Sequence, residues 1–234
     1  MRWVIGLPLL LAATACERSE PPADRIVETA EQIVDPAPSP PAPWAAGRFA
    51  PRDECPEVEG ASAFRSRLAA SVRDRDAAAL AGLAASDIKL DFGGGAGADE
   101  LRRRLSEPDT PLWHELEELL PLGCAANAQG GITLPWVAGQ ELPIRDPGAA
   151  MLVTGPEVPV LEEPRPDAAT IGTVSWDVVA IDGVRPDAPF QQVVLPDGSR
   201  GYMASGALRS MLDYRLTAAR RNGRWSITSF VAGD

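Results

Sequence analysis

The residue types that commonly perform catalysis are few in this 234-residue chain. His114 is the only histidine, so any histidine-based general base must be this residue. It lies at helical spacing from Glu117 and Glu118 in the segment PLWHELEELL, and no GxSxG nucleophile elbow accompanies it. We therefore expect an exposed helix histidine without a catalytic role.

Two pairs of acidic residues and one glycine-rich run also invite a chemical interpretation. Glu117 and Glu118 are adjacent, as are Glu162 and Glu163, and adjacent side chains diverge on a strand or lie about 100° apart on a helix. Neither pair has the facing geometry that hydrolysis by two carboxylates needs. The GGGAG run at 93–97 lacks the lysine and Ser or Thr of a phosphate-binding loop, so it predicts a turn. We expect no catalytic residue and no cofactor.

The chain begins with the residue order of a secretory signal peptide, over residues 1–15. Arg2 is followed by an apolar run that ends near Ala13 and is too short to span a bilayer, for which about 20 residues are needed. The next residues, ATAC, resemble the lipobox of bacterial lipoproteins, with Ala13 where leucine is commonest. The resemblance implies that Cys16 is lipidated. A soluble secreted protein cleaved near Ala15 is the alternative.

The chain has three cysteines, and an odd number in an exported protein needs an explanation. If Cys16 carries lipid, Cys55 and Cys124 remain to form a disulfide bond in an oxidising compartment. Two buried free thiols are the alternative. Three scattered cysteines and one histidine lack the spacing of a zinc site, so we expect no structural metal.

The composition restricts the possible partners and the start of the folded region. With 33 acidic and 22 basic side chains the net charge is −11, which disfavours nucleic acid and anionic lipid headgroups. Residues 16–54 are rich in proline, alanine and charge, and proline lacks a donor N–H. We expect this segment to be a disordered, proline-rich linker between the lipid and the folded part.

Residues 55–148 have the pattern of several helices and few strands. Apolar residues recur at helical spacing in several segments, and Asp76 is a candidate N-cap within this series. The segment IKLDF at 88–92 alternates apolar and charged residues, which predicts a half-buried strand. We therefore expect a helical α+β domain in this part of the chain.

The tail, residues 211–234, has alternating apolar residues on both sides of Asn222-Gly223, the turn favoured by β-hairpins. A lone hairpin is only marginally stable, so we expect it to pack on the first domain and to complete a sheet with strand 88–92. The intervening unit would then be an insertion. This outline is similar to nuclear-transport-factor-2-like α+β domains.

Residues 149–210 contain short β-rich runs separated by Gly, Pro and Asp turns. The segments VTGPEVPVLEEPRPDAATIGTV and FQQVVLPDGSRGYM, followed by ASGAL, resemble the opening and the end of a bacterial SH3 domain. The resemblance implies a small all-β barrel. Two residues depart from the family pattern: Leu161 stands near a usual arginine, and Tyr202 replaces the more usual tryptophan.

Three aromatic residues of this unit are relevant to binding, because the modules that it resembles hold peptides or cell-wall fragments in a groove between loops. Phe190 begins an alternating strand and is expected in the core. Trp176 and Tyr202 are the candidate ligand-binding residues, and burial in the barrel core is the alternative for both. From 152 to 209, acidic residues outnumber arginines, which favours a neutral or basic ligand such as an amine-bearing wall peptide.

The leading hypothesis is a non-enzymatic cell-envelope lipoprotein, anchored through Cys16, whose SH3-like unit binds peptidoglycan or a protein partner. Scaffolding within a larger complex fits the same features. The rival is a small-ligand-binding or enzymatic α+β domain with the SH3-like unit as an accessory, which requires a closed apolar pocket among residues 60–125 and 213–231. The residue after Cys16 is Glu17 and not an aspartate. By resemblance to Gram-negative lipoproteins, this implies an outer-membrane location facing the periplasm.

Overall fold

The protein is of the α+β class, with four α-helices and two largely antiparallel sheets among the residues that the structure describes. In this computed structural model these are residues 47–108, 110–143, 146–183 and 185–233. The expected signal peptide and the lipidation at Cys16 lie outside them. Within these ranges no helix has the length and apolar character needed to cross a membrane.

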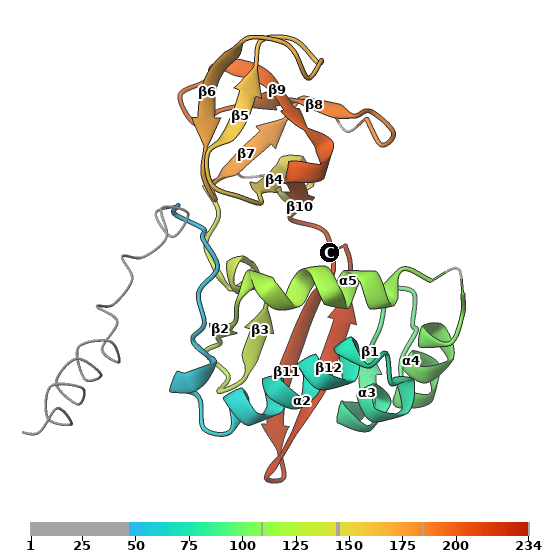
Figure 1. The fold of residues 1–234 in the computed structure, drawn as a ribbon. Coiled ribbons are helices and arrows are strands. Elements are labelled where there is room, and N and C mark those ends of the chain that lie inside the picture. Colours follow the sequence, from blue (N-terminus) through green and yellow to red (C-terminus); the bar gives the residue numbers. More distant parts are fainter. Residues whose placement is uncertain (1–46, 109, 144–145, 184, 234) are drawn as a thin grey trace, which may run out of the picture. The chain divides into compact units, whose positions relative to one another are not determined.

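The first sheet has five strands in the order β1-β12-β11-β3-β2 (Figure 1). Its strands are β1 Ala84–Lys89, β2 Ala125–Ala126, β3 Ile132–Leu134, β11 Arg215–Arg221 and β12 Arg224–Val231. β12 pairs with β1 in parallel, while β11 pairs antiparallel with both β12 and β3. The tail thus supplies central strands between strands from the first half of the chain. The predicted pairing of the tail hairpin with the strand of the helical segment is confirmed.

The turn between β11 and β12 has the backbone that its sequence predicts. Asn222 and Gly223 have φ values of 52° and 77°, in the left-handed region that a type I′ hairpin turn needs at both positions. Arg221 and Arg224 pair directly on either side of it. The turn chemistry therefore sets the register of the hairpin.

Helices cover one face of this sheet: α2 and α5 lie across β11 and β12, and α4 packs beside β1 (Figure 1). The helices are α2 Ala61–Arg73, α3 Ala77–Leu83, α4 Ala98–Leu105 and α5 Leu112–Leu119. On α2, Phe64 is fully buried and stacks on Trp225 of β12 with ring centroids 5.7 Å apart. Asp76 caps α3 by accepting hydrogen bonds from the N–H groups of Ala78 and Ala79, as predicted.

The space between these helices and the sheet is occupied by packed apolar side chains. The largest include Phe64, Leu68, Ile88, Leu101, Leu116, Leu119, Ile132, Leu134 and Leu216, each less than 2 % exposed. These side chains form the main core of the protein.

The strand predicted at 88–92 is displaced. β1 covers Ala84–Lys89, directly after α3, and Phe92 is 49 % exposed. The reason is local: the Asp91 carboxylate accepts hydrogen bonds from the following loop and turns the chain out of the sheet. The alternation of apolar and charged residues does not reveal that the Asp91 carboxylate will bind backbone N–H groups of the next loop.

Cys55 and Cys124 form a disulfide bond, as expected, across a sequence separation of 69 residues. Both are fully buried. Beside them, Asp53 forms a parallel β-bridge with Cys124. The disulfide therefore joins the start of the helical segment to the residues just before β2. It is compatible with an extracytoplasmic location, where disulfides persist.

The second sheet has seven strands in the order β10-β4-β7-β8-β9-β5-β6. They are β4 Ala150–Val153, β5 Val158–Leu161, β6 Thr170–Val174, β7 Val178–Ile181, β8 Phe190–Val194, β9 Arg200–Ala204 and β10 Leu208–Ser210. All pairings are antiparallel, and no pairing among the described residues joins the outer strands β6 and β10. The expected barrel is therefore not closed by hydrogen bonds.

We call residues 150–210 the β lobe, and residues 51–142 with 211–233 the helical lobe. The described residues belong to one compact unit. A small shared core contains Phe49, Ala125, Trp136, Val137, Ala150, Leu152 and Val178.

Phe49 also corrects the predicted linker boundary at residue 54. Its side chain is 3 % exposed, and its N–H donates to the carbonyl of Trp176 at 2.8 Å. The folded part therefore begins before residue 54, because burial of an aromatic side chain in the core stabilises this segment despite its proline-rich surroundings.

Candidate ligand-binding groove

A groove of about 700 Å³ lies where the helical lobe and the β lobe meet. Its apolar lining consists of Pro51, Pro121, Leu122, Pro156, Trp176 and Leu208. Its polar lining consists of Glu118, Thr154, Arg209 and Asp213, with Gly206 beside them. Apolar walls with a few convergent polar groups, at this volume, are typical of ligand sites.

Trp176 is held in the groove by its backbone. The residue lies between β6 and β7 with φ of 45°, in the left-handed region that is uncommon for a bulky side chain. Its N–H donates to the carbonyl of Gly155 at 3.0 Å, and its own carbonyl accepts from Phe49. Gly47 packs so closely that a Cβ there would overlap Trp176. A strained conformation fixed from both sides is typical of functional sites.

The indole nitrogen of Trp176 is a second unusual feature. Nε1 is buried and has no hydrogen-bond partner within the described part of the chain. A buried unpaired donor costs about 1 to 3 kcal/mol. The position of this ring in the groove is therefore not explained by internal hydrogen bonding.

Arg209 connects the two lobes at the other end of the groove. Its side chain is only 8 % exposed, and Nη2 donates to the carbonyl of Tyr214 at 3.1 Å. Nη1 lies 3.3 Å from Asp213 and 3.6 Å from Glu118 of α5. A buried guanidinium needs such partners, because an uncompensated buried charge is strongly destabilising.

Glu115, one turn before Glu118 on α5, adds a third acidic group. Burial raises the pKa of its carboxyl, the charge of Asp213 raises it further, and Arg209 partly opposes both effects. Its Oε2 atom is buried without a hydrogen-bond partner in the described structure. Glu115 therefore lies next to Asp213 of the groove lining, in surroundings that disfavour its ionised form.

The other sequence-predicted groups of α5 are separated from one another. His114 is exposed and lies 3.1 Å from Glu118, whereas Glu117 points to Arg75, 2.9 Å away. The predicted divergence of the adjacent glutamates on the helix is therefore confirmed. The His114 side chain is 66 % exposed, which agrees with the expected exposed helix histidine.

The structure does not bring the two candidate aromatic residues together. Tyr202 of β9 pairs with Leu161, the last residue of β5, while Trp176 follows Val174, which pairs with the first residue of β5. They therefore lie at opposite ends of that strand. Tyr202 is half-buried on the face of β9 opposite the buried Met203. Phe190 is also half-buried, not fully buried as expected.

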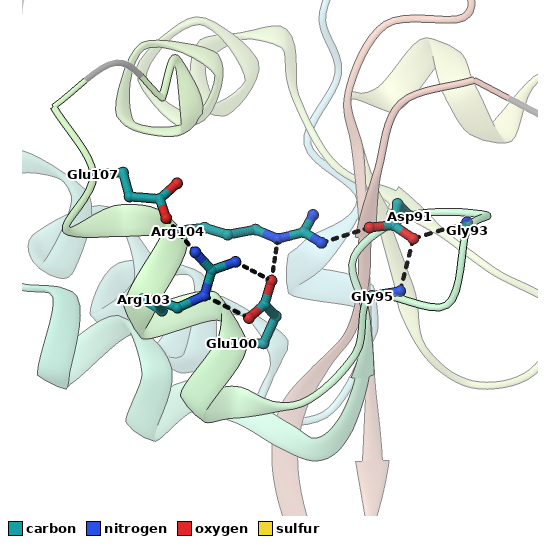
Figure 2. Close-up of polar contacts among 7 residues, drawn as sticks. All are labelled: Asp91, Gly93, Gly95, Glu100, Arg103, Arg104 and Glu107. Carbon is teal, nitrogen blue, oxygen red and sulfur yellow. Dashed lines mark hydrogen bonds and ion pairs between the residues drawn. The ribbon is translucent and has the colours of Figure 1, made fainter.

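The glycine-rich run forms a turn, and its amides are already in use. The Asp91 carboxylate accepts hydrogen bonds from the N–H groups of Gly93 at 2.8 Å and Gly95 at 2.7 Å (Figure 2). A Cβ at Gly95 would overlap Asp91 and Arg104. An internal carboxylate thus holds the position where an external phosphate would bind, which supports the interpretation as a turn.

An ion-pair network fixes this turn to α4. Arg104 lies 2.5 Å from Asp91 and 2.8 Å from Glu100 (Figure 2). Glu100 also pairs with Arg103 at 2.6 Å, and Arg103 pairs with Glu107. The hydrogen bonds from Arg104 and Gly95 lower the pKa of Asp91 to about 2, and those from Arg103 and Arg104 lower the pKa of Glu100 to about 2. Because each charge has an internal partner, we assign the network a structural role.

One group of potential metal ligands lies close together in the described ranges: Asp53, Cys55 and Cys124. Both sulfur atoms belong to the disulfide bond, so they do not act as thiolate ligands. Glu162 and Glu163 are exposed in the loop after β5. The residues named here do not form a metal-binding set.

Sequence reasoning missed Glu115, Arg209 and Asp213. The spacing of Glu115 and Glu118 contained a signal, because residues three apart share a helix face, whereas the adjacent glutamates do not. No sequence pattern indicated Arg209 or Asp213, since they approach α5 only through the return of the chain from the β lobe.

The fold and groove together define a two-lobed α+β protein with a ligand-sized site at the lobe junction. Comparisons of the chain with protein-family models, curated proteins and solved structures find no match.

Proposed function

We propose that this protein is a non-enzymatic cell-envelope lipoprotein that binds peptidoglycan or a protein partner through its SH3-like β lobe. Cys16 is its lipid anchor, and its folded part faces the periplasm from the outer membrane. The signal-like amino terminus, the lipobox-like ATAC and the disulfide bond support export.

The SH3-like identity of the β lobe rests on its local chemistry. Short antiparallel strands follow one another, and β8 and β9 are joined by a turn in which Gly198 has φ of 84°. Gly201 packs against Val160, where a Cβ would overlap that side chain. These features agree with the strand, Asp-Gly turn and Gly-aromatic step of the resemblance.

The groove at the lobe junction carries the proposal. It combines apolar walls, a ring in a strained conformation and a buried, paired arginine. Aromatic and proline surfaces provide contact area at low entropic cost, which suits a binding site. Trp176 is therefore the proposed ligand-contacting residue, while Tyr202 is a second proposed site separate from the groove.

Co-sedimentation with purified peptidoglycan sacculi tests the wall ligand, using the mature chain 17–234 and the variants Trp176→Ala and Tyr202→Ala. Each variant removes one half-buried aromatic group of the β lobe, and only Trp176 lines the groove. If the Trp176→Ala variant no longer sediments with the sacculi while Tyr202→Ala still does, the groove is the peptidoglycan-binding site. A wild-type protein that stays in the supernatant eliminates peptidoglycan and leaves a protein partner.

Fractionation of cells tests the anchor. We expect wild-type protein in the membrane fraction and a Cys16→Ala variant outside it, because a lipid chain supplies the membrane affinity. Equal distribution of the two proteins would contradict the lipoprotein assignment.

A further inference from the structure

We propose that the groove binds a peptide segment of a protein partner in which a lysine or arginine is flanked by apolar residues. This inference rests on the proposed function, because it requires the groove to be the binding site. It selects a protein partner over the wall and specifies the chemistry of the recognised segment.

The accessible charge in the groove is negative. The guanidinium of Arg209 is 8 % exposed and already contacts the Tyr214 carbonyl and two carboxylates. Glu118 and Asp213 have side chains that are 51 % and 30 % exposed. A ligand therefore encounters carboxylate oxygens and little of the guanidinium. The charge that complements this surface is a cation.

Glu118 is well suited to accept a ligand cation. Its distance of 3.6 Å to Arg209 exceeds that of a direct hydrogen bond, and its other partner, His114, is an exposed side chain. Neither contact holds the carboxylate strongly. An incoming ammonium or guanidinium group would gain a charge-assisted hydrogen bond to Glu118, while Arg209 would keep its nearer partner Asp213 at 3.3 Å.

The apolar walls specify the residues beside the cation. Pro51, Pro121 and Pro156 offer rigid apolar surface and no backbone N–H donor, and Trp176 adds an aromatic ring that favours cations over anions. Such walls do not supply the many hydrogen bonds that a sugar polymer requires. An anionic wall polymer is further disfavoured by the net charge of −11. An apolar peptide with one basic residue fits both parts of the groove.

A peptide array tests this inference with the mature chain 17–234. The probes are decapeptides with apolar, proline-containing randomised flanks and one central residue: lysine, arginine, acetyl-lysine or glutamate. We expect lysine and arginine sets to bind about tenfold more tightly than the acetyl-lysine set, because acetylation removes the charge. The glutamate set should bind least.

A matched pair of variants locates the cation. Glu118→Gln should weaken binding of the lysine set about fivefold. Glu117→Gln removes the same charge from the same helix but does not line the groove, so it should leave binding nearly unchanged. Circular dichroism of both variants checks that the fold is retained.

The outcomes separate this inference from the proposed function. Equal binding of lysine and acetyl-lysine sets, or equal effects of the two variants, overturns the cationic ligand while the groove remains a binding site. No peptide binding together with Trp176-dependent sedimentation on sacculi overturns the protein partner and supports the wall. No binding in either assay overturns the cationic peptide ligand and eliminates the wall as the ligand of the groove.

Discussion

Glu115 and Asp213 place two carboxyl groups beside the single buried guanidinium of Arg209. One positive charge does not fully compensate two negative ones in a partly desolvated site, so the pKa of the Glu115 carboxyl is raised. Burial is the largest cause of this rise, followed by the charge of Asp213.

This arrangement predicts a pH-dependent effect of Glu115→Gln. A carboxyl whose pKa is raised in the folded protein contributes stability below its ordinary value of 4.5, and this contribution is lost as pH rises through the raised pKa. At pH 7 the neutral glutamine should therefore increase the melting temperature, and the increase should disappear below about pH 4. Thermal unfolding between pH 3 and 8 measures this, with Glu117→Gln as the control. A difference from wild type that does not vary with pH would contradict it.

Asp91 predicts the opposite pH dependence. Its folded pKa of about 2 lies below the ordinary 3.8, so its carboxylate contributes stability above about pH 4 that is lost as pH falls toward 2. Asp91→Asn should weaken the turn and speed hydrogen exchange of the Gly95 amide at pH 6, because the carboxylate acceptor is lost. Asp99→Asn on α4 is the control, since Asp99 is almost fully exposed. Unchanged exchange at Gly95 would show that the carboxylate does not hold this loop.

At the level of elements, β11 connects strands that precede and follow the β lobe in the sequence. It lies between β12 and β3, and its inward residues meet the helices. β3 and β11 are separated in sequence by the whole β lobe, yet each depends on the other for its stability in the sheet.

Leu216→Ala in β11 should lower the free energy of unfolding by about 3 kcal/mol, because Leu216 is fully buried and a cavity would remain. Ile171→Ala on β6 is the control for losing a branched apolar side chain at a 53 % exposed position, and it should cost less than about 1 kcal/mol. Urea unfolding followed by circular dichroism measures both. Similar losses in the two variants would argue against a central role for β11 in the core.

At the scale of the whole molecule, the disulfide and the shared core join segments that are distant in sequence. Cys55–Cys124 links the two ends of the helical segment, and Phe49 packs with residues of both lobes. The lobes consequently share packing instead of being connected only by linkers.

Removing the disulfide should destabilise the protein substantially. For a closed loop of about 70 residues, chain entropy predicts a loss of roughly 4 kcal/mol, equivalent to a decrease of about 10 °C in melting temperature. A Cys55→Ser/Cys124→Ser variant measured by thermal unfolding tests this, and wild type treated with reductant should show a similar loss once the bond is reduced. A variant as stable as wild type would mean that the bond contributes little.

Features with local causes could be predicted from the sequence alone. Asp76 caps a helix, Asn222-Gly223 forms a hairpin turn, and the glycine run forms a turn, because each depends on backbone preferences within a few residues. The cysteine count likewise indicated the disulfide pair, and the periodicity of apolar residues indicated the α+β class. The predicted bounds of the strand at 88–92 were wrong, because the Asp91 carboxylate accepts a hydrogen bond from the N–H group of Gly93 and the chain leaves the sheet there.

The groove could not be predicted from the sequence, because its residues come from distant parts of the chain. Glu118 comes from α5, Trp176 from a turn of the β lobe, and Asp213 from the chain that returns to the sheet. Their proximity follows from the burial of Arg209 and the shared core around Phe49, which depend on contacts between residues distant in sequence. No periodicity or motif in the sequence predicts this proximity, because it is stabilised by packing contacts throughout the folded protein.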